Sequence, residues 1–135
     1  MTRGPALVLP CNIFRLPLGP EIAHGGVGTI GAVRIARAAE LAGACDFIDY
    51  AELPPGTTIG DHRHGPTEEE YYLVLAGTGR LRLEDDVFPV TAGDLVRNPP
   101  GGLHGLRNTG PEPLRLFVFQ LAVAPAAADA TAGTA

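Results

Sequence analysis

Residues 56–77 read GTTIGDHRHGPTEEEYYLVLAG and residues 93–108 read GDLVRNPPGGLHGLRN, and together they contain three of the four histidines of the chain. Side chains two residues apart on a β-strand project from the same face, so His62 and His64 can share one ion. His104 lies far along the chain and reaches the same ion only if another strand brings it there. The histidine spacing therefore predicts a metal site together with a closed sheet or sandwich.

The rest of the chain has the rhythm of an all-β fold with little helix. Its 18 glycines and 13 prolines separate short apolar runs, with turn signals about every ten residues, as in sandwiches and barrels. The segment 29–44 is expected to form a strand and then a helical turn, because Val33 and Ile35 favour a strand and the residues after them favour a helix. The other predicted strands are residues 46–53, 57–64, 70–76, 79–84, 87–90, 95–98, 104–108 and 114–123.

The length of 135 residues fits one domain with a hydrophobic core of its own. We expect residues 1–45 to form an N-terminal arm with a loop and an added strand, and residues 46–123 to form a β-barrel. Residues 124–135 are rich in alanine and have no large side chain to bury, so a flexible tail is expected there.

Charge and hydropathy argue against two classes of partner. The net charge is -5, and the ten basic residues are all arginines scattered along the chain, which disfavours nucleic acid as a partner. No apolar run is long enough to span a bilayer, and the apolar start of the chain is too short for a signal peptide. We therefore expect a cytoplasmic protein with no membrane partner.

The absence of two residue types excludes several catalytic mechanisms. The chain has neither serine nor lysine, which excludes a serine nucleophile, a Schiff-base lysine and a Walker-type phosphate loop. Cys11 and Cys45 lack the spacing of a redox or zinc motif, so we expect them to be reduced and buried as small apolar residues. Catalysis must come from other side chains or from a metal.

In its two motifs the chain resembles a small single-domain cupin. The second stretch matches the family pattern at all of its fixed positions, and the first stretch matches at four. The matching residues are Gly56, His62, His64 and Gly77, then Gly93, Pro99, Gly101, His104 and Asn108. The resemblance covers residues 56–108 and implies a cupin-type double-stranded β-helix, which is a jelly-roll barrel.

The metal-binding glutamate of the family is displaced by one residue here. The family has six residues between this glutamate and the glycine, which gives Glu70 here, but five residues then separate Glu70 from His64, one more than the family usually has. Glu70 shares its strand face with Tyr72, and the extra residue is most easily absorbed in the preceding turn. Glu70 is therefore the predicted ligand, with Glu69 as the fallback.

The predicted metal site thus consists of His62, His64, Glu70 and His104. Three imidazoles and one carboxylate suit one divalent transition metal per chain, whether Fe, Mn, Ni, Co, Cu or Zn. The resemblance implies a metal-dependent enzyme that acts on a small organic substrate inside the barrel, by dioxygenase or by isomerase or cyclase chemistry. The alternative is a non-catalytic cupin that binds or senses a small ligand at the metal, because no further acid, base or nucleophile is evident.

Tyr72 and His24 are the two candidate catalytic residues. Tyr72 has the strand parity to present its hydroxyl to a ligand, although a core position is the alternative. His24 lies in a glycine-rich loop that could fold over the pocket, although a surface position is the alternative. Gln120 points either inward or into solvent. Asn108 is expected to brace the loop that carries His104.

The resemblance also implies a homodimer that pairs through the outer edges of its sheets. The N-terminal strand around residues 31–35 precedes the two motifs and is a suitable element to add to a neighbour's sheet. The expected partners are therefore a small-molecule substrate and a second copy of the chain.

Overall fold

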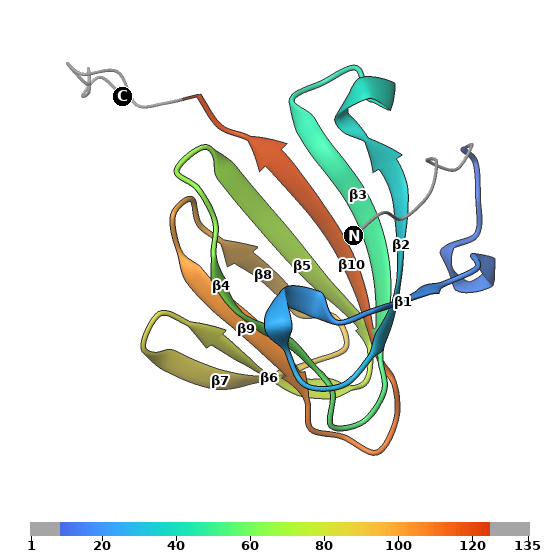
Figure 1. Ribbon diagram of the computed structural model, residues 1–135, viewed down its shortest axis with the longest axis vertical. Coiled ribbons are helices and arrows are strands. Elements are labelled where there is room, and N and C mark those ends of the chain that lie inside the picture. Colours follow the sequence, from blue (N-terminus) through green and yellow to red (C-terminus); the bar gives the residue numbers. More distant parts are fainter. Residues whose placement is uncertain (1–8, 125–135) are drawn as a thin grey trace.

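In the computed structural model, which describes residues 9–124, ten strands form two antiparallel sheets (Figure 1). The strands are β1 (Gly19–Glu21), β2 (Ile30–Arg37), β3 (Cys45–Leu53), β4 (Thr58–Arg63), β5 (Glu68–Ala76), β6 (Thr78–Leu83), β7 (Asp86–Thr91), β8 (Leu95–Asn98), β9 (Leu103–Asn108) and β10 (Leu114–Ala122). One sheet has the order β1-β2-β3-β10-β5-β8, and the other has the order β4-β9-β6-β7. The prediction of an all-β jelly roll is confirmed.

The helical segments of the described residues are three short 3-10 helices. They are η1 (Ile13–Arg15), η2 (Ala23–Gly25) and η3 (Ala38–Glu40). The strand β2 followed by η3 confirms the strand and helical turn predicted for residues 29–44. The sequence did not indicate β1, which is only three residues long and contains a glycine and a proline.

Apolar side chains at alternate positions of the strands form a core between the two sheets. Leu114, Leu116 and Val118 of β10 are buried on the same face, because successive side chains of a strand point to opposite sides. Leu81 of β6 and Leu106 of β9 meet them from the four-stranded sheet, each at 2% exposure or less. This inner core holds the two sheets together, and other inner-facing side chains of β2, β3, β5 and β10 line a cavity.

A second apolar cluster lies apart from this core. Val33 and Ile35 of β2 pack with Tyr50 of β3, and partly buried side chains from the segment before β1, including Ile13 and Leu18, pack against them. The N-terminal segment therefore contributes to folding as well as to the sheet.

The strand expected to add to a neighbour's sheet lies within its own sheet. β2 pairs with β3 along much of its length, and β1 pairs with it only at Ile30–Ala32. Residues 1–8 of the expected arm, and all but Ala124 of the expected tail, lie outside the described residues. No helix in the described part of the chain is long and apolar enough to cross a membrane.

Asn108 braces a different loop from the one expected. Its Nδ2 donates hydrogen bonds to the carbonyl oxygens of Leu53 and Glu112, at 2.7 and 2.8 Å, and its Oδ1 accepts one from the Gly110 amide. These bonds tie the end of β3 to the turn between β9 and β10. Asn108 is the last residue of β9, at the opposite end of this strand from the loop that precedes His104.

Candidate metal centre

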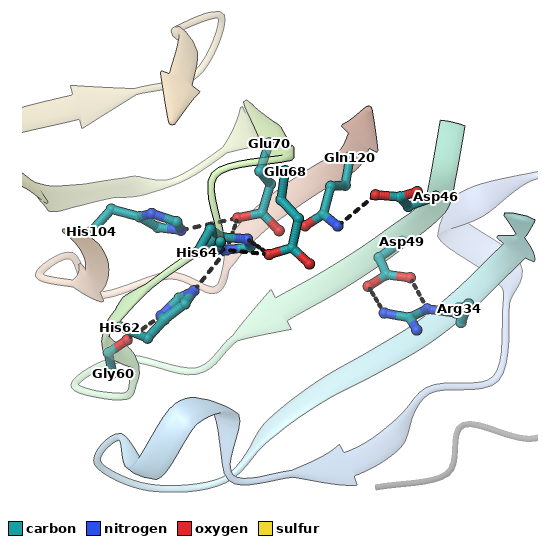
Figure 2. Close-up of polar contacts among 11 residues, drawn as sticks. Arg34, Asp46, Asp49, Gly60, His62, His64, Glu68, Glu70, His104 and Gln120 are labelled. Carbon is teal, nitrogen blue, oxygen red and sulfur yellow. Dashed lines mark hydrogen bonds and ion pairs between the residues drawn. The ribbon is translucent and has the colours of Figure 1, made fainter. Parts of the chain in front are cut away.

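The four predicted ligands come together between the two sheets (Figure 2). His62 is on β4, His64 follows the end of that strand, and His104 is on β9, where it lies directly opposite His62 in the strand register. Glu70 comes from β5 in the other sheet. One ligand atom from each residue lies within 4.8 Å of all the others.

Short contacts join the Nε2 atoms of the three imidazoles and one carboxylate oxygen into a chain, in the order His62, His64, Glu70, His104. The Nε2 atoms of His62 and His64 are 3.1 Å apart. Glu70 Oε1 lies 3.3 Å from Nε2 of His64 and 3.0 Å from Nε2 of His104. Two ligand atoms at right angles on one octahedral ion, each about 2.1 Å from it, are roughly 3.0 Å apart. The donor types and their separations therefore fit one divalent transition metal.

The second nitrogen of two imidazoles is held by a neighbour. Nδ1 of His62 lies 2.7 Å from the Gly60 carbonyl oxygen, which can only accept, so Nδ1 carries the proton and Nε2 presents its lone pair to the cluster. Nδ1 of His64 faces the Glu68 carboxylate at 3.4 Å. Contacts of this kind orient imidazoles that bind metals.

The protonation states differ within the cluster. Burial lowers the pKa of His62 to about 4, so this ring is neutral at pH 7. The hydrogen bond to Glu70 raises the pKa of His64, so a proton competes with a metal ion at that nitrogen. Burial alone would raise the pKa of Glu70, but hydrogen bonds with His104 and His64 outweigh burial and lower it to about 2. The carboxylate is therefore charged.

The two candidate glutamates lie on opposite faces of β5. Glu70 is buried on the inner face together with Tyr72 and Val74, as the parity argument expects. Glu69 points to the other face, where it forms an ion pair with Arg97 of β8. The geometry favours Glu70 over the fallback.

A cavity of about 530 Å³ opens beside the cluster. His62, His64 and Glu70 lie on its wall, and apolar side chains from the six-stranded sheet, including Ile30 and Val118, line it further. The volume is within the range of pockets that hold small organic ligands. A ligand in this cavity would lie next to an ion in the cluster.

Tyr72 lines the cavity and is also part of the hydrophobic core. Its side chain is 2% exposed, and its ring meets the His104 ring edge-on with the centroids 5.5 Å apart. Burial, the charge of Glu70 and a hydrogen bond to Glu70 raise the pKa of Tyr72 well above its usual value. The hydroxyl therefore keeps its proton, which it donates to the Glu70 carboxylate.

His24 lies at the mouth of the cavity, exposed to solvent on one side. Its ring stacks on the His62 ring with the centroids 3.5 Å apart and an angle of 7° between the planes. The residue has a left-handed backbone, with φ of 51°, and desolvation lowers the pKa of its imidazole. The glycine-rich loop thus folds over one side of the cluster.

The cavity has a further polar group that the sequence did not predict. Arg34 of β2 and Asp49 of β3 form a two-pronged ion pair, with Nε to Oδ1 at 2.9 Å and Nη2 to Oδ2 at 3.1 Å. The available signal was Asp49 itself, which has the strand parity of the inward-facing Ala51. Gln120 also faces inward, where its Nε2 donates to Asp46 at 2.8 Å.

A family model described as a cupin domain matches residues 49–120. A crystal structure of a predicted oxalate decarboxylase from Thermotoga maritima superposes with a TM-score of 0.73 at 26% identity, over 78% of this chain and 94% of that one. This structural match extends the similarity to most of the chain.

Three curated proteins are similar over part of their length. An oxalate-binding protein from Thermotoga maritima is 29% identical over 87 residues, which are 64% of this chain and 71% of that protein. Protein SchB from Streptomyces halstedii is 37% identical over 92 residues, 67% of this chain and 65% of SchB. A 5-nitrosalicylic acid 1,2-dioxygenase from a Bradyrhizobium species is 28% identical over 67 residues, 50% of this chain and 31% of that enzyme.

Proposed function

The chain belongs to the cupin domain family, and we propose that it is a metal-dependent enzyme that acts on a small organic substrate bound in the barrel. The observation that carries this proposal is the convergence of His62, His64, Glu70 and His104 beside the cavity. A site with these donors is expected to hold one divalent transition metal.

The proposed roles of the residues follow from their places. His62, His64, His104 and Glu70 would hold the metal, which when bound would supply Lewis-acid or oxygen-activating chemistry. Tyr72 keeps its proton, and with Glu70 bound to the metal its hydroxyl would donate a hydrogen bond to a substrate oxygen instead. His24, at the mouth, has an imidazole that is neutral at pH 7 and can accept a proton from a bound substrate.

Two reaction types remain candidates, a dioxygenase reaction and an isomerase or cyclase reaction. The similarity to a 5-nitrosalicylic acid 1,2-dioxygenase supports the first. Metal analysis of protein purified without a histidine tag, followed by oxygen-uptake assays with catechols and diketones, separates them. Iron with oxygen uptake supports a dioxygenase, and zinc or nickel without oxygen uptake supports an isomerase or cyclase.

A metal-containing binding protein without turnover is the second candidate. The similarity to an oxalate-binding protein favours it. Calorimetric titration of the metal-loaded protein with oxalate, paired with product analysis, tests it. Binding of oxalate without product from any substrate offered would replace the enzyme proposal with this one.

Removal of the metal tests the enzyme proposal itself. We expect a chelator to abolish turnover and the original metal to restore it. Cys11 and Cys45 lie outside the cluster, so a variant with both changed to alanine is expected to keep its activity. Turnover by metal-free protein, or loss of turnover in the cysteine variant, would contradict metal-dependent chemistry.

A further inference from the structure

The cavity has a second polar group on the wall away from the metal cluster. Arg34 and Asp49 lie opposite each other in the register of β2 and β3, and both line the cavity (Figure 2). In Figure 2 this pair lies on one side of the view and the imidazoles lie on the other. Glu68 and Gln120 lie between them in the same view.

The fold alone does not account for this ion pair. Asp49 is only 7% exposed, and the neighbouring inner positions are occupied by Phe47, Ala32 and Ala51. Burying charges costs desolvation energy, and apolar replacements of buried ion pairs are often neutral or stabilising. A charged pair at this position is better explained by a ligand that it contacts.

The guanidinium of Arg34 is held in a fixed orientation. Asp49 binds its Nε and Nη2, and its Cζ lies 4.2 Å from the centre of the Phe47 ring. Within residues 9–124, Nη1 donates to no acceptor that the structure shows, so its two N–H groups remain available. A donor whose orientation is already fixed loses little entropy when it binds a ligand.

An apolar floor lies between Arg34 and the metal cluster. Arg34 pairs with Asp49, Asp49 pairs with Val118 of β10, and Val118 pairs with Tyr72 of β5, which shares its strand face with Glu70. The side chain of Val118 is only 6% exposed and forms the floor. This floor and the cavity volume of about 530 Å³ suit a compound the size of a substituted benzene ring.

The Arg34–Asp49 pair favours a neutral group at this second position. The Asp49 carboxylate binds Arg34 through two nitrogens and so offsets the charge of the guanidinium. A carboxylate on the ligand would bring a second negative charge close to Asp49, whereas a carbonyl or hydroxyl oxygen would not.

We propose that Arg34 is a specificity-determining residue that donates a hydrogen bond from Nη1 to a neutral oxygen at the far end of the substrate. The substrate is then an aromatic-sized compound with an oxygen pair that binds the metal at one end and a carbonyl or hydroxyl oxygen at the other. This inference rests on the proposed metal site, because the cluster defines the first end.

Two probes that differ by one oxygen test the proposal. They are 2-hydroxy-5-acetylbenzoate and 2-hydroxy-5-ethylbenzoate, which share the metal-binding oxygens and have similar size. Calorimetry with the zinc-loaded protein is expected to show about tenfold tighter binding of the acetyl compound, as for a hydrogen bond to a charged donor. Arg34→Met should remove this preference and leave the affinity for the ethyl compound unchanged.

Arg82→Met is the matched control. Arg82 also pairs with an aspartate, Asp61, at 3.1 Å, but the pair is exposed and outside the cavity. The Arg82→Met variant should keep the tenfold preference for the acetyl compound. If Arg34→Met does not fold, the double variant Arg34→Met/Asp49→Leu removes the donor without leaving a buried unpaired carboxylate, and it should bind both compounds equally.

The outcomes separate this proposal from the proposed function. Equal binding of the two compounds by the zinc-loaded wild-type protein, or a preference that persists without Arg34, would overturn the role of Arg34 while the metal site stands. Zinc binding without binding of either compound would overturn the ligand chemistry proposed here. A wild-type protein that takes up no metal would refute the proposed function, and this inference would fall with it.

Discussion

Single residues decide how the cluster presents its ligand atoms. His62 is held by the Gly60 carbonyl, His64 faces the Glu68 carboxylate, and Glu70 accepts contacts from two imidazoles. These partners hold three nitrogens and one oxygen close together in a partly buried place. Neutral His62 and charged Glu70 are the forms that a divalent ion requires.

The first prediction concerns the imidazoles. His64→Ala and His104→Ala should each lower metal affinity by more than about tenfold, because even loss of a group that only orients a ligand costs that much. Elemental analysis of dialysed, tag-free protein measures how much metal each variant retains. His24→Ala is the control, since His24 stacks on His62 but is not part of the cluster. Full metal content in both test variants would rule out the site.

The second prediction concerns the glutamate. Glu70→Gln should weaken metal binding by at least about tenfold, because it removes the charge from a ligand. Glu69→Gln should leave binding unchanged, since Glu69 pairs with Arg97 on the other face of β5. Metal titration of the two variants compares them directly. If Glu69→Gln alone loses the metal, the ligand is Glu69.

At the scale of elements, the site depends on how β4 meets its neighbours. The register between β4 and β9 shifts between Ile59 and His62, and His62 lies opposite His104 beyond the shift. The loop of η2 packs closely on β4, where a Cβ atom at Gly60 would overlap the carbonyl oxygen of His24. This contact holds the His24 ring against His62.

The third prediction tests that contact. Gly60→Ala should destabilise the protein by about 1–3 kcal/mol, because the added methyl group forces η2 away from β4. Urea unfolding gives the difference. Gly43→Ala is the control, since a Cβ atom there would meet nothing within 4 Å, and its effect should stay within about 0.5 kcal/mol. Equal stability of the two variants would show that η2 is loosely held.

At the scale of the whole molecule, apolar packing joins the two sheets without help from a disulfide. One cluster lies between the sheets, and a second joins β2, β3 and the segment before β1. Both cysteines are free. Hydrophobic burial in a domain of this size is expected to maintain the fold without an ion.

The fourth prediction follows from this packing. Removal of the metal should leave the far-ultraviolet circular dichroism unchanged. It should only lower the melting temperature, because the folded state loses the stabilisation that metal binding provides. Thermal scans with and without a chelator measure this. Collapse of the β spectrum on chelation would make the ion a structural one.

The fifth prediction is a homodimer that pairs through sheet edges. β1 pairs with only three residues of β2, so in the part of the chain that the structure describes, the rest of that edge has no strand partner shown. An open edge of this kind favours pairing with a second copy. Light scattering at micromolar concentration should give twice the mass of the chain, and a monomer would reject the prediction.

The sequence by itself determined every strand except β1, and it also determined the four members of the cluster. Alternation, turn residues and motif spacing are local properties, so β3 to β10 and the shared face of His62 and His64 could be predicted from them. Strand parity also favoured Glu70, because a shift of one residue reverses the face of a strand.

Only the tertiary structure decided which distant side chains share the cavity. Arg34 meets Asp49 through the pairing of β2 with β3, and His24 reaches His62 through the packing of η2 on β4. The bonds of Asn108 to Leu53 and Glu112 likewise depend on where the end of β3 lies. Contacts between segments far apart in the chain depend on strand order and register, and no local pattern records them.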